Sequence, residues 1–311
     1  MSNEKIIVIA GPTAVGKTDV AIGLCLALGT EIVSCDSMQI YKYMDIGSAK
    51  PTPEERAAAV HHMVDIIDPH DDFSVVRYRD MADRCIEDIT GRGMTPIVSG
   101  GTGLYLDSLL YDLDFGGANE PDLEARRELY HIAEEEGPAT LHDILESLDK
   151  DAAGRIHPNN VKRVVRAIEA ATSGEPLDDF ADVSEREMRR EAVLIGLRRS
   201  RPDLYDRIDR RVDIMIENGL EDEVRTLISM GLTADDPAMK GIGYKEMIAY
   251  LEGEYGFDEA VRLIKRNSRR YAKRQMTWLN RYKTMEWFSF EEYNDTNVMT
   301  EAILEWLKRK S

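Results

Sequence analysis

The sequence predicts an α/β protein in which a parallel sheet, flanked by helices, carries a phosphate-binding loop. Four short apolar runs have the composition of buried parallel strands, and helix-like stretches separate them along the chain. The first run leads directly into a glycine-rich turn that opens a helix, which is the arrangement of a P-loop protein. The four runs cover residues 5–10, 31–34, 95–99 and 191–197.

A helical insertion interrupts this pattern. Between about Gly116 and Glu191 strand-like runs vanish and charged segments with helical spacing dominate. These segments cover residues 121–136, 140–149 and 159–172. We therefore predict a P-loop core domain made of residues 1–115 and 192–311, with a helical C-terminal part, and an all-helical insertion domain made of residues 116–191.

Bulk composition limits the possible settings of the protein. With 311 residues, 43% of them hydrophobic, the chain can bury a real core. It has no apolar stretch of 18 residues or more and no apolar leader at its N-terminus, so we expect no membrane association. Three widely spaced cysteines form neither a disulfide framework nor a zinc-site spacing. We expect a cytoplasmic protein that acts as a monomer.

The glycine-rich turn matches the P-loop pattern G-x-x-x-x-G-K-[ST]. Its backbone N–H groups can surround phosphate oxygens, and the following helix N-terminus adds partial positive charge. Lys17 adds a full charge, and the Thr18 hydroxyl can bind Mg²⁺. The strand before the turn and the helix after it disfavour a chance match. The loop consists of Gly11, Pro12, Thr13, Ala14, Val15, Gly16, Lys17 and Thr18.

Two more polar loops follow predicted strands. Asp36 comes directly after the second strand, and the turn Gly100–Gly103 comes after the third. The carboxyl ends of parallel strands meet at one edge of the sheet, which is where ligands bind. A carboxylate there can hold magnesium through water or act as a general base. The alternatives are that Asp36 only caps a turn and that Gly100–Gly103 is an ordinary strand-to-helix turn.

One basic helix stands out in an acidic chain. The net charge of −18 argues against a polyanionic partner, but residues 261–283 contain nine Lys or Arg and no acid. Subtracting these nine charges leaves −27 on the rest of the chain. On a helix seven of them form two adjacent rows, Arg262, Arg266, Arg270 and Arg274 beside Lys265, Arg269 and Lys273. Such a stripe costs stability unless something anionic meets it, so contact with nucleic acid or pyrophosphate is favoured over a solvated face.

Taken together, these motifs resemble one family, the tRNA dimethylallyltransferases, also called tRNA isopentenyltransferases. Besides the P-loop, the chain has D-S-x-Q-x-Y at residues 36–41, G-G-T-G-L-Y at 100–105 and Y-A-K-R-Q-x-T-W at 271–278. The resemblance extends over nearly the whole chain. No cysteine follows Cys85, so the chain is similar to the short bacterial form, which lacks the C-terminal zinc finger.

The resemblance implies transfer of a dimethylallyl group from dimethylallyl diphosphate to N6 of adenosine 37 in tRNAs that read UNN codons. Lys17, the loop N–H groups and Mg²⁺ at Thr18 would then stabilise the diphosphate leaving group. Asp36 would take a proton from N6, and Thr102 would form a hydrogen bond near the same amine. Arg207 and Arg211 resemble family arginines that reach toward the diphosphate.

The resemblance also implies contacts with the tRNA anticodon stem-loop. The adenine would leave its stack, and its edges would be read by Ser37, Met38 and Gln39 beside Asp36 and Thr102. The family has an arginine near the position of Glu124, and Arg126 is its nearest substitute here. The other residues that match tRNA-contacting segments are Lys162, Arg163, Arg166, Lys240, Gly243, Tyr244, Lys245, Arg269, Arg270, Lys273 and Arg274.

Three alternatives remain. A P-loop small-molecule kinase explains the first hundred residues but gives the basic helix no role. An adenine-nucleotide isopentenyltransferase shares the N-terminal motifs, although a mononucleotide needs neither the basic helix nor the insertion. An RNA-binding module with a degenerate P-loop is disfavoured by the intact Gly16-Lys17-Thr18.

Overall fold

A computed structural model describes residues 5–113, 123–174, 186–293 and 295–310. The chain forms two compact units, one from Met1–Tyr111 with Ser184–Ser311 and the other from Asp112–Val183. The second unit thus ends earlier than the predicted insertion, which ran to Glu191. The reason is that Met188 already pairs with Tyr111 of the first unit, while Arg189 and Arg190 both contact the Asp83 carboxylate there.

The first unit is built on a six-stranded sheet whose strands are ordered β3-β2-β4-β1-β5-β6 and pair in parallel throughout. The strands are β1 (Lys5–Ala10), β2 (Ile32–Cys35), β3 (His61–His62), β4 (Ile97–Gly100), β5 (Glu191–Arg198) and β6 (Glu286–Ser289). The predicted α/β class is therefore confirmed. The sequence pattern missed β3, which has only two residues, and β6, whose four residues begin with Glu286 and end with Ser289 and so lack a continuous apolar run.

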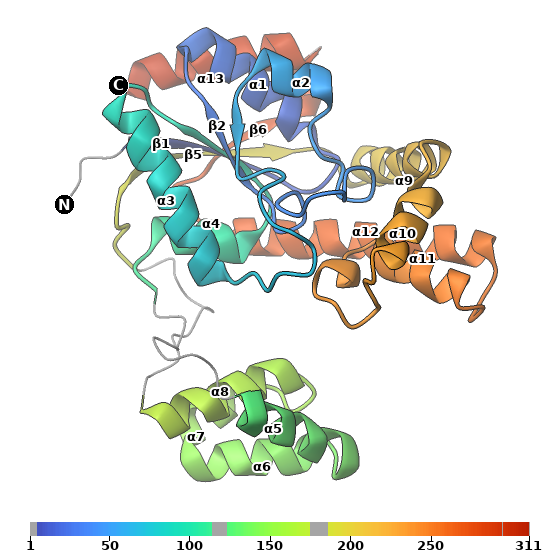
Figure 1. Cartoon of the computed structure of the whole chain (residues 1–311). Coiled ribbons are helices and arrows are strands. Elements are labelled where there is room, and N and C mark those ends of the chain that lie inside the picture. Colours follow the sequence, from blue (N-terminus) through green and yellow to red (C-terminus); the bar gives the residue numbers. More distant parts are fainter. Residues whose placement is uncertain (1–4, 114–122, 175–185, 294, 311) are drawn as a thin grey trace. The chain divides into compact units, whose positions relative to one another are not determined.

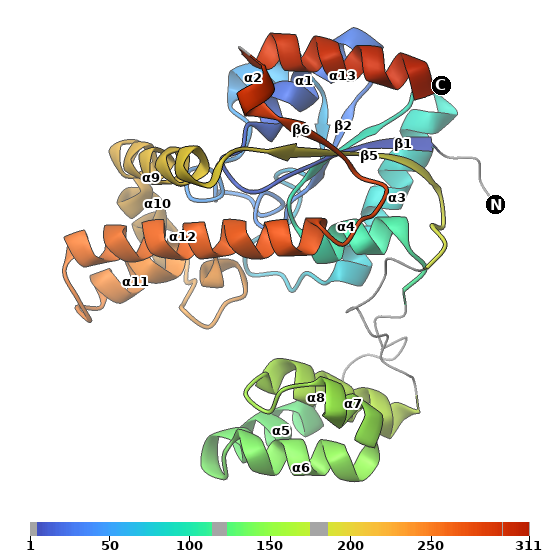
Figure 2. The same cartoon turned by 180° about the vertical axis from the view of Figure 1, so that it is seen from behind.

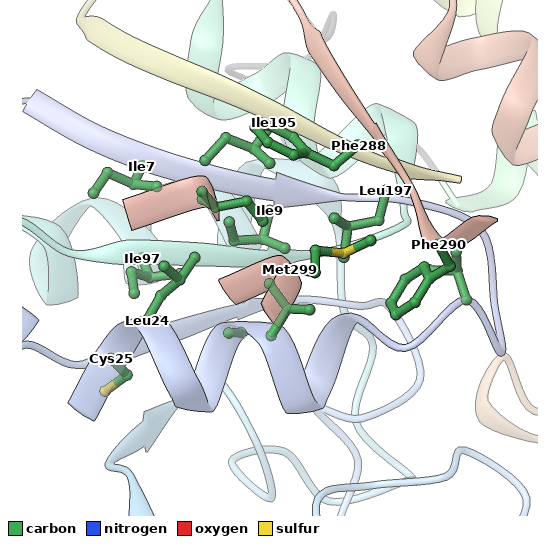
Figure 3. Packing of buried hydrophobic residues seen from close by; sticks show 14 of the residues in the cluster. Ile7, Ile9, Leu24, Cys25, Ile97, Ile195, Leu197, Phe288, Phe290 and Met299 are labelled. Atoms are coloured by element: carbon green, nitrogen blue, oxygen red, sulfur yellow. The ribbon is translucent and has the colours of Figure 1, made fainter. Parts of the chain in front are cut away.

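Helices cover both faces of the sheet (Figure 1). One face carries α1 (Lys17–Leu28) and α13 (Thr296–Lys310), and the other carries α3 (Val75–Gly91) and α4 (Gly103–Leu110). Between the sheet and the α1 face lies a core that includes Ile9, Leu24, Ile195, Phe288 and Met299 (Figure 3). Burial of these apolar side chains is the main contribution to the free energy that stabilises the strands and therefore the loops at their ends.

The C-terminal part of the first unit is helical, as the sequence predicts. It contains α9 (Arg201–Glu217), α10 (Leu220–Ser229), α11 (Tyr244–Leu251) and α12 (Phe257–Leu279), with the short 3₁₀ helices Ala238–Lys240 and Phe290–Glu292. A further short helix, α2 (Pro53–Ala58), precedes β3. The long helix α12 runs beside both α9 and α4 (Figure 2), so it links the C-terminal helices to the sheet layer.

The second unit is a small bundle of α5 (Leu123–Glu135), α6 (Pro138–Leu148), α7 (Lys150–Arg155) and α8 (Val161–Ser173). Its own core contains Leu141, Leu145, Val164 and Ile168. The three predicted helices are present, and the first two residues of predicted segment 121–136 lie outside the described part of the chain. The sequence pattern missed α7, which has only six residues.

Within the described ranges, every helix is either too short or too polar to cross a bilayer.

Candidate active site at the carboxyl edge of the sheet

The strand register brings the polar loops to one place. Gly100, at the end of β4, is aligned with Ala10 on one side and with Cys35 on the other. Ala10 is in turn aligned with Gly196 of β5. The strands β1, β2 and β4 therefore end at the same level, beside β5, so the P-loop, Asp36 and the Thr102 turn emerge side by side.

The P-loop takes the tight conformation that its sequence demands. Gly16 has φ 109°, a conformation that favours glycine, and a Cβ added there would also make a tight contact of 3.0 Å with the Phe290 ring. Lys17 begins α1, and its Nζ donates a hydrogen bond of 2.9 Å back to Pro12 O. The ammonium thus lies over the loop, and Thr18 follows within the first turn of α1.

Burial lowers the pKa of Lys17 from 10.5 to about 8. The neighbouring Asp36 carboxylate raises this pKa and the neighbouring Arg211 lowers it, both by smaller amounts than burial. Asp36, Lys17 and Arg211 therefore act on one another as a single cluster of charges, which is the arrangement that the strand-end argument anticipates.

Three arginines hold oxygen atoms of the P-loop. Arg207 Nε donates to Ala14 O at 3.0 Å, and Arg211 Nη1 donates to Thr13 Oγ1 at 3.1 Å. Arg199 Nε donates to Val15 O at 2.9 Å, while its guanidinium stacks on the Phe290 ring at 3.7 Å. Burial lowers the pKa of both Arg207 and Arg211. Sequence reasoning did not single out Arg199, although it lies in a basic run directly after β5.

Asp36 caps a turn and faces the charge cluster at the same time. Its Oδ1 accepts hydrogen bonds from Met38 N at 2.9 Å and Gln39 N at 3.4 Å, which fixes the carboxylate. Among the described residues, none donates a hydrogen bond to Oδ2. Thr102 Oγ1 accepts a hydrogen bond from Ser37 N at 3.1 Å, so the second and third loops are joined directly.

Two neighbouring side chains differ from what the sequence led us to expect. Both polar atoms of the Gln39 amide are bound within the protein, because Oε1 accepts from Ser34 Oγ at 3.0 Å and Nε2 donates to Ala49 O at 3.1 Å. Gln39 therefore holds the loop together. Tyr271 of α12, which we did not predict, lies beside Thr102 and Asp36. The Tyr271 pKa is raised to about 12, mainly by burial and also by the Asp36 charge, while a hydrogen bond with Thr102 acts in the lowering direction.

Most of the predicted tRNA-contacting cations of the first unit are exposed, namely Lys240, Lys245, Arg270, Lys273 and Arg274. Tyr244 is an exception, since its side chain is 0% exposed and its hydroxyl donates to Glu223 Oε1 at 2.8 Å. Gly243 is buried as well, and its N–H donates to Glu246 Oε2 at 2.8 Å. The prediction that Tyr244 and Gly243 offer a contact surface is therefore wrong. Tyr244 is the first residue of α11, and its ring packs in the hydrophobic core.

The predicted cationic stripe of α12 is divided in two. Arg269 pairs with Asp209 of α9, and Lys265 Nζ lies 2.6 Å from Asp213 Oδ1 of the same helix. For these two residues the anionic partner lies within the protein, because α9 places two acids four residues apart against them. In the part of the chain that the structure describes, Arg270, Lys273 and Arg274 take part in no ion pair.

Of the predicted tRNA-contacting residues in the second unit, Lys162 and Arg166 of α8 are exposed, and Arg163 is half-buried. Arg126, the expected substitute for the family arginine, donates from Nε and Nη2 to the Glu169 carboxylate at 2.5 and 2.8 Å. Arg166 Nη1 lies 3.8 Å from the same carboxylate. Arg126 thus already has an anionic partner within its own unit.

Comparison with known proteins places the chain in a family. Residues 39–282 match the model described as IPP transferase, and residues 4–63 match the one described as isopentenyl transferase. The chain is 49% identical to the tRNA dimethylallyltransferase of Alkaliphilus metalliredigens over 97% of this chain and 96% of the relative. It is 46% identical to that of Clostridioides difficile over 99% of each.

Solved structures agree. The tRNA isopentenylpyrophosphate transferase of Bacillus halodurans superposes with a TM-score of 0.72 at 41% identity, covering 99% of this chain and 98% of that one. A eukaryotic dimethylallyltransferase solved while acting on tRNA gives 0.79 at 28% identity, covering 96% of this chain and 78% of that one. These matches confirm the resemblance drawn from the motifs, and the chain belongs to the tRNA dimethylallyltransferase family.

Proposed function

We propose that this protein transfers a dimethylallyl group from dimethylallyl diphosphate to N6 of adenosine 37 in tRNAs that read UNN codons, which gives N6-isopentenyladenosine. The observation that carries the proposal is the convergence of the P-loop, its arginines and the Asp36 carboxylate at one sheet edge, with the exposed cations of α12 in the same unit. In the reaction the bond between the allylic carbon and the diphosphate oxygen breaks, a bond from N6 to that carbon forms, and N6 loses one proton.

The cationic residues of the P-loop fit a diphosphate leaving group. Negative charge builds on its oxygens as the allylic bond breaks, and Lys17 with the loop N–H groups can stabilise that charge. Arg207 and Arg211 each use one nitrogen to hold the loop. Because an arginine has five N–H donors, both can still donate to a diphosphate in the same position.

The oxygen donors of this site also fit Mg²⁺. The described residues include no cluster of three or more His, Cys, Asp or Glu that could hold a metal by itself. Magnesium, however, prefers one or two protein oxygens together with water and substrate phosphates. The Thr18 hydroxyl would hold it. When bound, the ion would neutralise charge on the diphosphate.

Asp36 is the proposed general base. The N6 lone pair of adenine is delocalised into the ring, so this amine needs help to lose its proton as the new bond forms. The Asp36 carboxylate is held at Oδ1 by two backbone N–H groups, which leaves Oδ2 to accept the proton. Thr102 and Ser37, which are hydrogen-bonded to each other, would contact the adenine.

The tRNA would bind on exposed cations, because the phosphate backbone dominates the affinity of such complexes. In the first unit these are Lys240 and Lys245 together with the outer row of α12, which we define as Arg270, Lys273 and Arg274. In the second unit they are Lys162 and Arg166. A single chain supplies every residue of the proposed site, so a monomer would suffice, and a tRNA substrate implies a cytoplasmic reaction.

The proposal is tested with Asp36→Asn and labelled dimethylallyl diphosphate. We expect turnover to fall by about 100- to 10,000-fold while tRNA affinity stays within a few-fold, because a base acts mainly in the transition state. Asp68→Asn is the matched control, since Asp68 caps an exposed turn through a hydrogen bond from His70 N of 3.1 Å. Transfer of the γ-phosphate of ATP, without prenyl transfer, would instead identify a kinase.

A further inference from the structure

We infer that Gln275 is a positioning residue for this reaction, joining the P-loop, the Thr102 turn and the tRNA-facing helix α12 through one buried amide. The inference rests on the proposed function. The side chain of Gln275 is only 5% exposed, although it lies one residue after the exposed Arg274. The Gln275 side chain therefore points into the protein, whereas the cations of the outer row of the same helix are exposed to solvent.

Both ends of the Gln275 amide are used. Its Oε1 accepts a hydrogen bond from Thr13 N at 2.8 Å, and its Nε2 donates one to Gly101 O at 2.9 Å. A backbone N–H can only donate and a carbonyl can only accept, so these two partners fix the orientation of the amide. No other uncharged side chain of similar length offers a donor and an acceptor side by side in this way.

The geometry around Gly101 shows how closely these parts fit. A Cβ at Gly101 would lie 2.3 Å from Gln275 Nε2 and 2.8 Å from Gly11 O. The turn before Thr102 therefore touches both the amide and the first residue of the P-loop. Thr13, the other partner, also accepts a hydrogen bond from Arg211 at its hydroxyl. Without the amide, the partly buried Thr13 N–H and the buried Gly101 carbonyl would lose these partners at the point where the two loops meet.

The next turn of α12 makes this support rigid. Asp107 of α4 is 0% exposed, and its carboxylate accepts hydrogen bonds from Trp278 Nε1 at 3.1 Å and Arg281 Nη2 at 2.9 Å. The Tyr282 hydroxyl also donates to it. This buried cluster fastens the end of α12 to α4, whose N-terminus follows Thr102. Gln275 thus projects from a fixed support toward both loops.

Gln275 acts through Thr13 and Gly101 and is not expected to touch the reacting atoms. Its loss should loosen the alignment of the P-loop with the Thr102 turn, so the diphosphate should bind more weakly and transfer should slow. The outer row of α12 is unaffected, so tRNA affinity should be retained. A general loss of folding would weaken the binding of both substrates, and would not weaken diphosphate binding alone.

The first test uses Gln275→Met, which keeps the length of the side chain and removes both hydrogen bonds. We expect the Kd for inorganic pyrophosphate, measured by calorimetry, to rise about tenfold, as the loss of one to two hydrogen bonds predicts. The Kd for an anticodon stem-loop should stay within about twofold. Thr277→Ala, an exposed change on the same helix that loses only a bond to Lys273 O, is the control. Unchanged pyrophosphate affinity in Gln275→Met would overturn the inference.

The second test uses Gln275→Glu. An ionised carboxylate cannot donate to Gly101 O, whereas a protonated one has a donor and an acceptor in the places of the amide, and burial raises the pKa of the carboxyl group. As the pH is lowered from about 8 to about 6, the pyrophosphate affinity of Gln275→Glu relative to wild type should rise and should exceed that of Gln275→Met. A ratio that is constant over this range would overturn the inference. Both tests measure binding alone, so they can fail while wild-type transfer to tRNA succeeds, and the reverse.

Discussion

The first unit holds two kinds of cation that a sequence does not distinguish. Around the P-loop, Lys17, Arg207 and Arg211 are half-buried, and each donates a hydrogen bond to a P-loop oxygen. Along the outer row of α12 the cations are exposed, and the described part of the chain gives them no acidic partner. The first kind can act on one ligand atom at one position, and the second kind adds to the field that attracts a polyanion.

The helix α12 shows that position decides which kind a residue becomes. We define its inner row as Lys265 and Arg269, which face the acids Asp213 and Asp209 of α9. Residues of one type, spaced four apart on one helix, therefore serve helix packing on one side and remain available on the other. The charge of a helix is a poor guide to its binding surface until the neighbouring helices are known.

Among the cations, the largest effect should come from Lys17, which is half-buried at the P-loop. Lys17→Met removes the full charge at the leaving group, and we expect transfer to fall by about 100- to 1,000-fold with tRNA affinity nearly unchanged. Steady-state kinetics at saturating tRNA measures the first quantity and filter binding the second. A comparable loss in both would contradict the separation between the two kinds of cation.

The pKa of Lys17 sharpens this prediction. Because the pKa is lowered to about 8, pyrophosphate affinity should fall as the pH rises above about 8, since the anion needs the protonated lysine. Lys17→Arg keeps its charge and should remove this lysine-dependent part of the pH profile. The stability of the ligand-free protein should change with pH in the opposite direction to pyrophosphate affinity. The folded state loses the proton earlier than the unfolded state, so this group makes stability rise between about pH 8 and its ordinary pKa of 10.5.

The outer row should give a smaller effect with a different signature. Changing Arg270, Lys273 and Arg274 to Gln should weaken tRNA binding by about 10- to 100-fold at low salt and flatten the slope of log K against log salt by about two to three. Pyrophosphate affinity should not change. An unaltered salt slope would show that tRNA phosphates bind elsewhere.

The inner row should give the smallest effect on binding. Arg269→Gln should leave tRNA affinity within about twofold and lower the free energy of unfolding by about 0.5 to 1 kcal/mol, because the pair with Asp209 is only half-buried. Denaturant titration measures the stability change. The charge swap Arg269→Asp with Asp209→Arg should recover most of it. Loss of tRNA affinity equal to that of the outer row would remove the distinction between the rows.

Local patterns were enough to predict the parts of the site that follow strands. The P-loop, Asp36 and the Thr102 turn each follow an apolar run. Because the carboxyl ends of parallel strands lie at the same edge of a sheet, these loops meet there. The same reasoning could not find the role of Arg199, because a basic residue after β5 has no pattern that separates a P-loop contact from a solvated side chain.

Sequence alone therefore determined the fold class, the phosphate-binding loop and the family. Only the tertiary structure decided that Tyr244 is core, that Gln39 and Arg126 are engaged within the protein, and that Arg269 faces Asp209. The physical reason is sequence separation, because a hydrophobic period only indicates which residues of one helix or strand share a face. By contrast, Arg269 and its acid are 60 positions apart, and Thr13 and Gln275 are 262 apart. Such partners are chosen by how the layers pack, after each element has formed.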